Sequence, residues 1–160
     1  MNVVSLTNVD HSRVKEFFIK HWGSSVMVVS TGVYHCDQLD GLAVINEDGE
    51  IIALLTYVTR DTECEIISLD SIIESKGIGS MLLEAFEKLA REKEIKKIML
   101  VTTNDNIRAL QFYQKRGYTL ANIIINAVEK ARRLKPEIPY VAENGIPIRD
   151  EIILEKNFSE

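Results

Sequence analysis

The chain has 160 residues, of which 46% are hydrophobic, and its formal net charge at pH 7 is −5. This length suffices for one domain with a sizeable core, and we expect residues 1–160 to form a single domain. The acidic balance disfavours a nucleic-acid partner, which needs a basic surface, and no apolar run reaches membrane-spanning length, so no membrane partner is expected.

The cysteine and histidine positions predict no metal site. Cys36 and Cys64 have neither metal-binding nor redox spacing, and the three histidines lie in the first quarter of the chain without ligand spacing. The N-terminus lacks a basic segment followed by an apolar one, so no signal peptide is expected. We therefore expect reduced thiols in a cytoplasmic protein.

Apolar periodicity and turn residues predict a chain of alternating strands and helices. In chain order these are a strand at 3–7, a helix that ends by Gly23, strands at 42–45, 50–59 and 64–69, a helix at 77–93, a strand at 97–102, a helix at 106–116, a strand at 118–125, a helix at 127–134 and a strand at 148–155. Residues 24–40 predict one strand or an ordered loop. Because hairpins come first and helical crossovers later, this order predicts a mixed sheet with helices on its faces.

Two glycines, Gly77 and Gly79, lie where a predicted strand turns into an amphipathic helix. Glycine lets a backbone approach a ligand closely, since it has no Cβ. The first amides of a helix lack internal partners, and the helix dipole adds partial positive charge there. The sequence therefore predicts a site for a phosphate or a pyrophosphate at this turn.

Two stretches together resemble the GCN5-related N-acetyltransferases (GNAT family). Residues 74–80, ESKGIGS, resemble the family's acetyl-CoA pyrophosphate loop, although Glu74 stands where the family has Arg or Gln. Residues 104–118 match the family's second signature at these positions: Asn106, Ala109, Phe112, Tyr113, Gly117 and Tyr118. The resemblance implies an α/β (α+β) fold whose mixed, mostly antiparallel sheet has about seven strands flanked by helices.

The resemblance also implies acetyl-CoA as cosubstrate and a set of residues that bind it. The backbone of 69–71 would pair with pantetheine like an added strand, and Lys76 is a candidate for the missing positive charge near Glu74. Asn106 would contact pantetheine, or else satisfy the local backbone at a helix start. The cofactor-binding candidates are Leu69, Asp70, Ser71, Lys76, Gly77, Ile78, Gly79, Ser80, Asn104, Asn106 and Tyr113.

Two residues are candidates for the catalytic proton transfers. By resemblance Tyr113 is the general acid, because its phenol is protonated at neutral pH; the alternative is an aromatic core residue. Glu65 is the tentative general base, since apolar neighbours would raise its pKa, but it also reads as a solvated residue at a strand start. Strand alternation puts Glu65 on one face with Ile67 and Leu69. Asp70 then lies on the opposite face, where it would bind the amine or end the strand.

The resemblance implies transfer of an acetyl group to a primary amine of a small-molecule or peptide acceptor, within a ternary complex. The sequence does not identify the acceptor, and acidic composition points only faintly to polyamines or aminoglycosides. Residues 136–150 form a long loop that either borders the acceptor or is structural. Two alternatives remain, a CoA-binding regulatory module and, less favoured, a P-loop nucleotide site. The oligomeric state is open, with a homodimer as one candidate.

Overall fold

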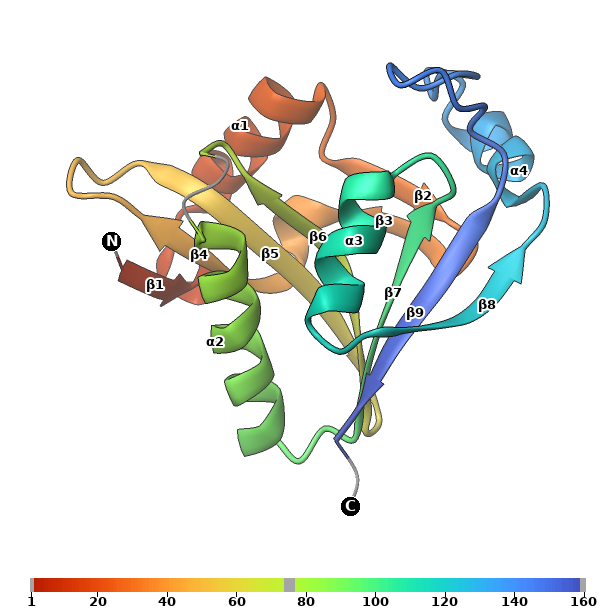
Figure 1. The fold of residues 1–160 in the computed structure, drawn as a ribbon. Coiled ribbons are helices and arrows are strands. Elements are labelled where there is room, and N and C mark those ends of the chain that lie inside the picture. The colour runs from red at the N-terminus through yellow and green to blue at the C-terminus, as the bar shows by residue number, and fades with distance from the viewer. Residues whose placement is uncertain (1, 74–76, 159–160) are drawn as a thin grey trace.

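The computed structural model describes residues 2–73 and 77–158, which form a mixed sheet flanked by helices (Figure 1). The seven strands, in spatial order, are β1 (Asn2–Ser5), β4 (Asp40–Ile45), β5 (Ile51–Arg60), β6 (Glu63–Ser71), β7 (Lys97–Thr103), β9 (Glu151–Asn157) and β8 (Thr119–Ile124). Every neighbouring pair is antiparallel except β6 with β7. The prediction of a mixed, mostly antiparallel sheet is confirmed.

The helices cover both faces of this sheet (Figure 1). They are α1 (His11–Trp22), α2 (Ile78–Glu92), α3 (Ile107–Lys115) and α4 (Ala127–Leu134). One apolar cluster joins the sheet to α2 and α3 through residues such as Leu82 and Phe86. A second joins the other face to α1 through Val14 and Phe18. Within the described ranges, no helix has the length and apolar character needed to cross a bilayer.

The helix ends follow from their capping residues. Asp10 accepts a hydrogen bond from the Ser12 amide at the start of α1, and Gly23 ends that helix at a φ of 78°. Asn106 caps α3, where its Oδ1 accepts from the Ala109 amide at 3.2 Å. Gly77 precedes α2 at a φ of 70°, a conformation that glycine adopts without strain.

Residues 24–40 form more regular structure than the sequence predicted. Strands β2 (Val26–Val29) and β3 (Gly32–His35) pair as a hairpin, and a short 3₁₀ helix follows at Cys36–Gln38. Ser30 and Thr31 form the turn of this hairpin. The Ser30 amide donates to the Glu151 carboxylate at 3.1 Å, and the Thr31 hydroxyl donates to the Glu65 carboxylate at 2.8 Å. The expectation of one strand or a loop was wrong because these partners are remote in sequence.

A bulge in β6 reverses the strand faces that simple alternation predicts. Ile66 pairs with Tyr57 and Ser68 with Thr56, so Ile67 is an extra residue in β6. Leu69 consequently packs with the α2 cluster rather than beside Glu65. Asp70 lies opposite Leu54, on the α1 face. Glu65 and Asp70 therefore share one face, which corrects the prediction that they lie on opposite faces.

Strands β6 and β7 pair over only part of their length. Their parallel ladder joins Glu63–Ile66 to Lys97–Leu100, although β6 runs on to Ser71 and β7 to Thr103. Beyond the ladder the two strands diverge (Figure 1). The backbone edge of 67–71 therefore faces a gap in the sheet rather than a neighbouring strand.

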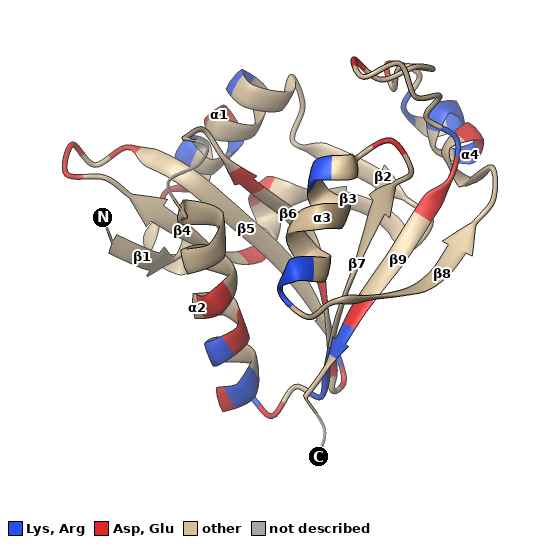
Figure 2. Ribbon diagram, in the orientation of Figure 1, with Lys and Arg blue, Asp and Glu red and all other residues tan. Residues whose placement is uncertain are grey.

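The basic residues of α4 (Figure 2) hold neighbouring segments in place. Arg132 donates to the carbonyl oxygens of Pro139 at 2.7 Å and Ile148 at 2.6 Å, and stacks on the Tyr140 ring. Lys135, just after the helix, donates to the Val26 carbonyl of the hairpin at 2.7 Å. The loop at 136–150 is thus ordered by α4.

Candidate active site

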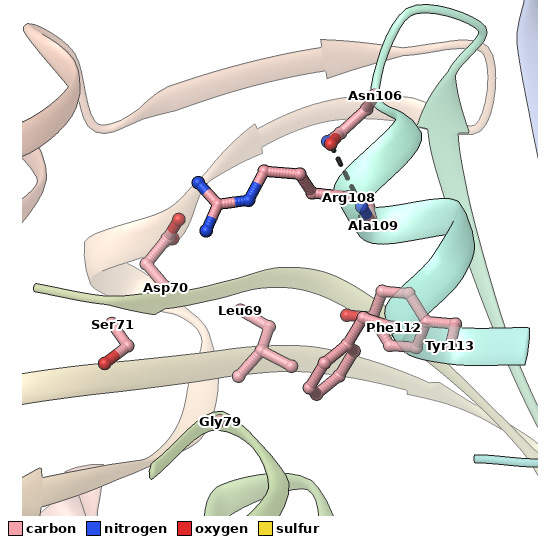
Figure 3. A pocket seen from close by; sticks show the side chains of 9 residues that line it. All are labelled: Leu69, Asp70, Ser71, Gly79, Asn106, Arg108, Ala109, Phe112 and Tyr113. Carbon is pink, nitrogen blue, oxygen red and sulfur yellow. Dashed lines mark hydrogen bonds between the residues drawn. The ribbon is translucent and has the colours of Figure 1, made fainter. Parts of the chain in front are cut away.

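A cavity of about 360 Å³ lies between the end of β6, the start of α2 and one face of α3 (Figure 3). Some of the residues in its walls were predicted from the sequence to bind the cofactor, and others were not predicted. The lining residues are Leu69, Asp70, Ser71, Gly79, Asn106, Arg108, Ala109, Phe112 and Tyr113. The cavity is therefore built at the place where β6 and β7 separate.

A second cavity of about 150 Å³ adjoins the first at the gap in the sheet. Trp22 from α1 and Met27 from β2 line its far side, beyond β6 and β7. The residues common to both cavities are Leu69, Asp70, Asn106, Ala109 and Tyr113. The two cavities therefore adjoin, one on the side of α2 and α3 and the other on the side of α1.

The start of α2 offers backbone donors to the larger cavity. The first hydrogen bond within the helix runs from the Met81 amide to the Gly77 carbonyl, so the amides of 78–80 precede the internal ladder. A Cβ on Gly79 would lie 3.5 Å from the Phe112 ring, on the cavity wall. The Ile78 side chain is buried in the core, so only its backbone is available to a ligand.

Arg116, at the C-terminal end of α3, brings positive charge to this helix start. Arg116 donates through Nε to the Ser80 hydroxyl at 3.0 Å, and its guanidinium lies 3.8 Å from the centre of the Phe112 ring. An arginine here adds to the partial positive charge of the helix terminus, which favours an anion. The predictions for Glu74 and Lys76 lie outside the described residues.

Asp70 and Tyr113 each line both cavities. Burial raises the pKa of Asp70 to about 7, and a hydrogen bond from Trp22 partly opposes that shift. The buried Oδ2 atom of Asp70 has no hydrogen-bond partner among the described residues, and the Arg108 guanidinium points toward this carboxylate (Figure 3). Burial, and secondarily the charge of Asp70, raise the pKa of Tyr113, which therefore stays protonated at neutral pH.

Glu65 has other partners and lines neither cavity. Its carboxylate accepts from Arg60 at 2.7 Å and from the Thr31 hydroxyl at 2.8 Å, with the Tyr34 hydroxyl at 3.4 Å. These contacts tie the β2–β3 hairpin to β5 and β6. The geometry therefore favours a structural role for Glu65 over the tentative role of general base.

Asn104 is likewise held outside both cavities. Its Oδ1 accepts from the amides of Arg149 at 3.0 Å and Asp150 at 2.9 Å, and its Nδ2 donates to the Pro147 carbonyl. The side chain thus fastens the end of the 136–150 loop to β7. No residue of that loop lines either cavity within the described part of the chain, so the geometry favours the structural reading of the loop.

The structure brings most of the other predicted site residues together and adds several that the sequence did not single out. Leu69, Asp70, Ser71, Gly79, Asn106 and Tyr113 line the larger cavity, with Gly77, Ile78 and Ser80 at the adjoining helix start. The additions are Trp22, Met27, Arg108 and Arg116. Arg108 and Arg116 lie within the second signature, whereas no sequence pattern connects Trp22 to β6. Across the described residues, no group of three or more His, Cys, Asp or Glu could hold a metal ion.

Comparisons with known proteins agree with this geometry. The sequence model of the acetyltransferase (GNAT) family matches residues 10–118. The Bacillus subtilis (strain 168) protein YxbD is 56% identical over 156 residues, which cover 98% of each chain.

Two solved structures are similar in fold and were determined with the cofactor bound. A Bacillus subtilis acetyltransferase in complex with CoA has a TM-score of 0.64 and 26% identity, over 77% of this chain and 79% of that one. A GNAT family acetyltransferase from Elizabethkingia anophelis with acetyl-CoA bound has a TM-score of 0.66 and 25% identity, over 75% of this chain and 76% of that one. The family match spans more than half of the chain and includes α2, β6, β7 and α3. The chain therefore belongs to the acetyltransferase (GNAT) family.

Proposed function

We propose that this protein is an acetyl-CoA-dependent N-acetyltransferase that transfers acetyl directly to a primary amine of a small-molecule or peptide acceptor. The observation that carries the proposal is the pair of adjoining cavities, which share Asp70 and Tyr113 as lining residues. Two adjoining cavities give each of two substrates its own site next to the same two residues. Acetyl-CoA occupies the larger cavity, and the acceptor enters from the side of Trp22 and Met27.

The larger cavity fits acetyl-CoA in the chemistry of its walls. The amides of 78–80 and the Arg116 guanidinium suit a pyrophosphate, because they combine donors with positive charge. The free backbone edge of 69–71 suits the amide groups of pantetheine, which can pair with it as a strand would. The two solved relatives that bind CoA or acetyl-CoA support this assignment.

When bound, acetyl-CoA supplies a thioester whose acyl carbon accepts the amine. Asp70 accepts the proton that the acceptor ammonium must lose before its nitrogen can attack. A pKa of about 7 makes this carboxylate both ionised enough and basic enough for the task near neutral pH. Tyr113 donates its phenolic proton to the sulfur as the carbon–sulfur bond breaks and the carbon–nitrogen bond forms. The extra proton on the newly bonded nitrogen then passes to the Tyr113 phenolate, which restores the phenol, and Asp70 releases its proton to solvent.

Asp70 thus takes the place of Glu65 as the proposed general base. Asp70 lines both cavities, while the Glu65 carboxylate is engaged by Arg60 and Thr31. Both residues lie on the same face of β6, so the bulge at Ile67 is what gives Asp70 its position. Asn106 is proposed to bind pantetheine, since it lines both cavities in addition to capping α3.

Calorimetric titration with acetyl-CoA, with ATP as the control ligand, tests the cofactor assignment. A screen of primary amines for release of the CoA thiol, run on the native protein and on Tyr113→Phe, then tests catalysis. Direct transfer predicts intersecting lines in double-reciprocal plots when both substrates are varied, whereas a covalent acyl-enzyme gives parallel lines. Tight acetyl-CoA binding with no turnover of any amine would instead support the CoA-binding regulatory module.

A further inference from the structure

Trp22 is an exposed aromatic residue at the entrance to the smaller cavity. It is the last residue of α1, and 46% of its surface is exposed. Its ring meets the buried Phe18 ring edge-on, with 6.4 Å between the ring centres, and its indole lies close enough to Asp70 to lower the pKa of that carboxyl. The indole is therefore held in place on one side and open to a ligand on the other.

Apolar and polar residues share the walls around Trp22. Met27, Ile67 and Val101 are among the apolar residues of this cavity, and Ser68 and Thr102 are among the polar ones. Among the described residues that line the two cavities, Asp70 is the only carboxylate. An acceptor with several ammonium groups would bring more positive charge than these walls can compensate.

We propose that Trp22, Met27 and Asp70 form an acceptor subsite that selects a primary monoamine with an apolar body. The single ammonium lies against the Asp70 carboxylate and beside the Trp22 ring, which attracts cations through its π face. The apolar body of the acceptor packs on Trp22 and Met27. The proposal rests on the proposed function for the identity of the site, but the binding that it describes is measurable without turnover.

Trp22 is the only tryptophan in the chain, so its fluorescence reports directly on this subsite. We would titrate the native protein at about pH 8, where Asp70 is ionised, with phenethylamine, n-hexylamine, spermidine and kanamycin. We expect saturable emission changes with both monoamines, at concentrations at least about tenfold lower than for either polycation. 1-Hexanol, which lacks the ammonium group, is the matched control and should give no saturable change.

Kinetics with substitutions at Trp22 give a second readout. Trp22→Ala should raise the KM for phenethylamine by about tenfold while kcat stays within about threefold, because binding rather than chemistry loses a partner. Trp22→Phe keeps an aromatic face, so its KM for phenethylamine should rise less than that of Trp22→Ala. It also takes the place of the alanine variant if that variant fails to fold. Ile19→Ala removes an exposed side chain on the same helix that lines neither cavity, and should change nothing.

Two outcomes would overturn the proposal: tighter binding of spermidine or kanamycin than of the monoamines, or an unchanged KM in both Trp22 variants. Failure of the proposed function has a different signature. If the monoamines bind in the predicted order but no amine releases CoA thiol, acetyl transfer is refuted and the subsite stands. If polycations are acetylated preferentially, acetyl transfer stands and the subsite is refuted.

Discussion

The carboxylate of Asp70 and the phenol of Tyr113 line the same gap in the sheet and are electrostatically coupled. Asp70 comes from the end of β6 and Tyr113 from the buried side of α3. The negative charge of Asp70 disfavours ionisation of the phenol, so the pair is biased toward one carboxylate and one protonated phenol. That is the protonation state in which one group can accept a proton and the other can donate one.

Replacing Tyr113 by phenylalanine should remove the proton donor without emptying the cavity. We expect kcat to fall by about 100-fold or more, while the Kd for acetyl-CoA changes within about threefold. Steady-state kinetics and calorimetry measure the two quantities. The matched control is Tyr118→Phe, whose hydroxyl donates to Glu87 at 2.8 Å away from the cavities. It should cost stability, by about 1–2 kcal/mol, and leave kcat nearly unchanged.

Replacing Asp70 by asparagine should stabilise the protein at neutral and alkaline pH. The pKa of Asp70 is about 7 in the folded protein, against an ordinary value of 3.8. Between these values the folded state binds more protons than the unfolded state, so this carboxyl lowers stability as pH rises from about 4 to about 7. Asp70→Asn removes that cost, and should raise the free energy of unfolding by about 1–3 kcal/mol at about pH 8.

The same variant should gain little at about pH 4, where the carboxyl is protonated in the folded state. Urea unfolding at the two pH values provides the comparison. Equal stabilisation at both would show that packing, and not ionisation, is responsible. Activity at about pH 8 should fall by at least about 100-fold, because the general base is missing.

The pH profile of the native enzyme should report the ionisation of Asp70. We expect kcat/KM to rise with pH through about 7, the pKa of this carboxyl, and to level off above it. Trp22 and Arg108 face this carboxylate, and Tyr113 and Cys36 are coupled to it by charge. Because the Trp22 hydrogen bond lowers the pKa of Asp70, Trp22→Phe should move the rise to higher pH. If the pH profile of Trp22→Phe is unchanged, the observed ionisation belongs to a group other than Asp70.

The two glycines near the start of α2 should respond differently to substitution. Gly79→Val adds bulk at the cavity wall, next to Phe112, and should raise the Kd for acetyl-CoA by about tenfold or more with little change in Tm. Gly77→Ala meets no atom within 4 Å but keeps a φ of 70°, so backbone strain should lower stability by about 1 kcal/mol. Its Kd should change within about threefold. If Gly77→Ala weakened acetyl-CoA binding and Gly79→Val did not, the anion contacts would lie at Gly77.

Replacing Glu65 by glutamine distinguishes the structural role from the catalytic one. The substitution weakens the contacts with Arg60 and Thr31, and should lower the free energy of unfolding by about 1–2 kcal/mol. If Glu65 is structural, kcat stays within about threefold and the pH profile is unchanged. Loss of the rise near neutral pH in this variant would restore Glu65 as the base.

Features that depend on neighbouring residues could be predicted from the sequence alone. Gly77 and Gly79 mark the start of α2, Asn106 caps α3, and the spacing of Phe112 and Tyr113 puts both on a helix beside the cavity. Such patterns are local, because a helix start or a helical face is fixed by residues within a few positions of one another. The family resemblance and the order of strands and helices follow from the same local signals.

Which carboxylate reaches the gap, and which residues lie opposite it, depends on contacts between distant parts of the chain. One extra residue in β6 moves every later side chain of that strand to the face opposite the one that alternation predicts. No sequence pattern in the strand predicts the bulge at Ile67. The partners of Glu65 and Asn104 come from the hairpin turn and from the 136–150 loop. Trp22 reaches Asp70 because α1 packs on the same face of the sheet. These contacts join residues far apart in the chain, so they contribute to stability only once the fold has formed. Local sequence patterns therefore do not predict them.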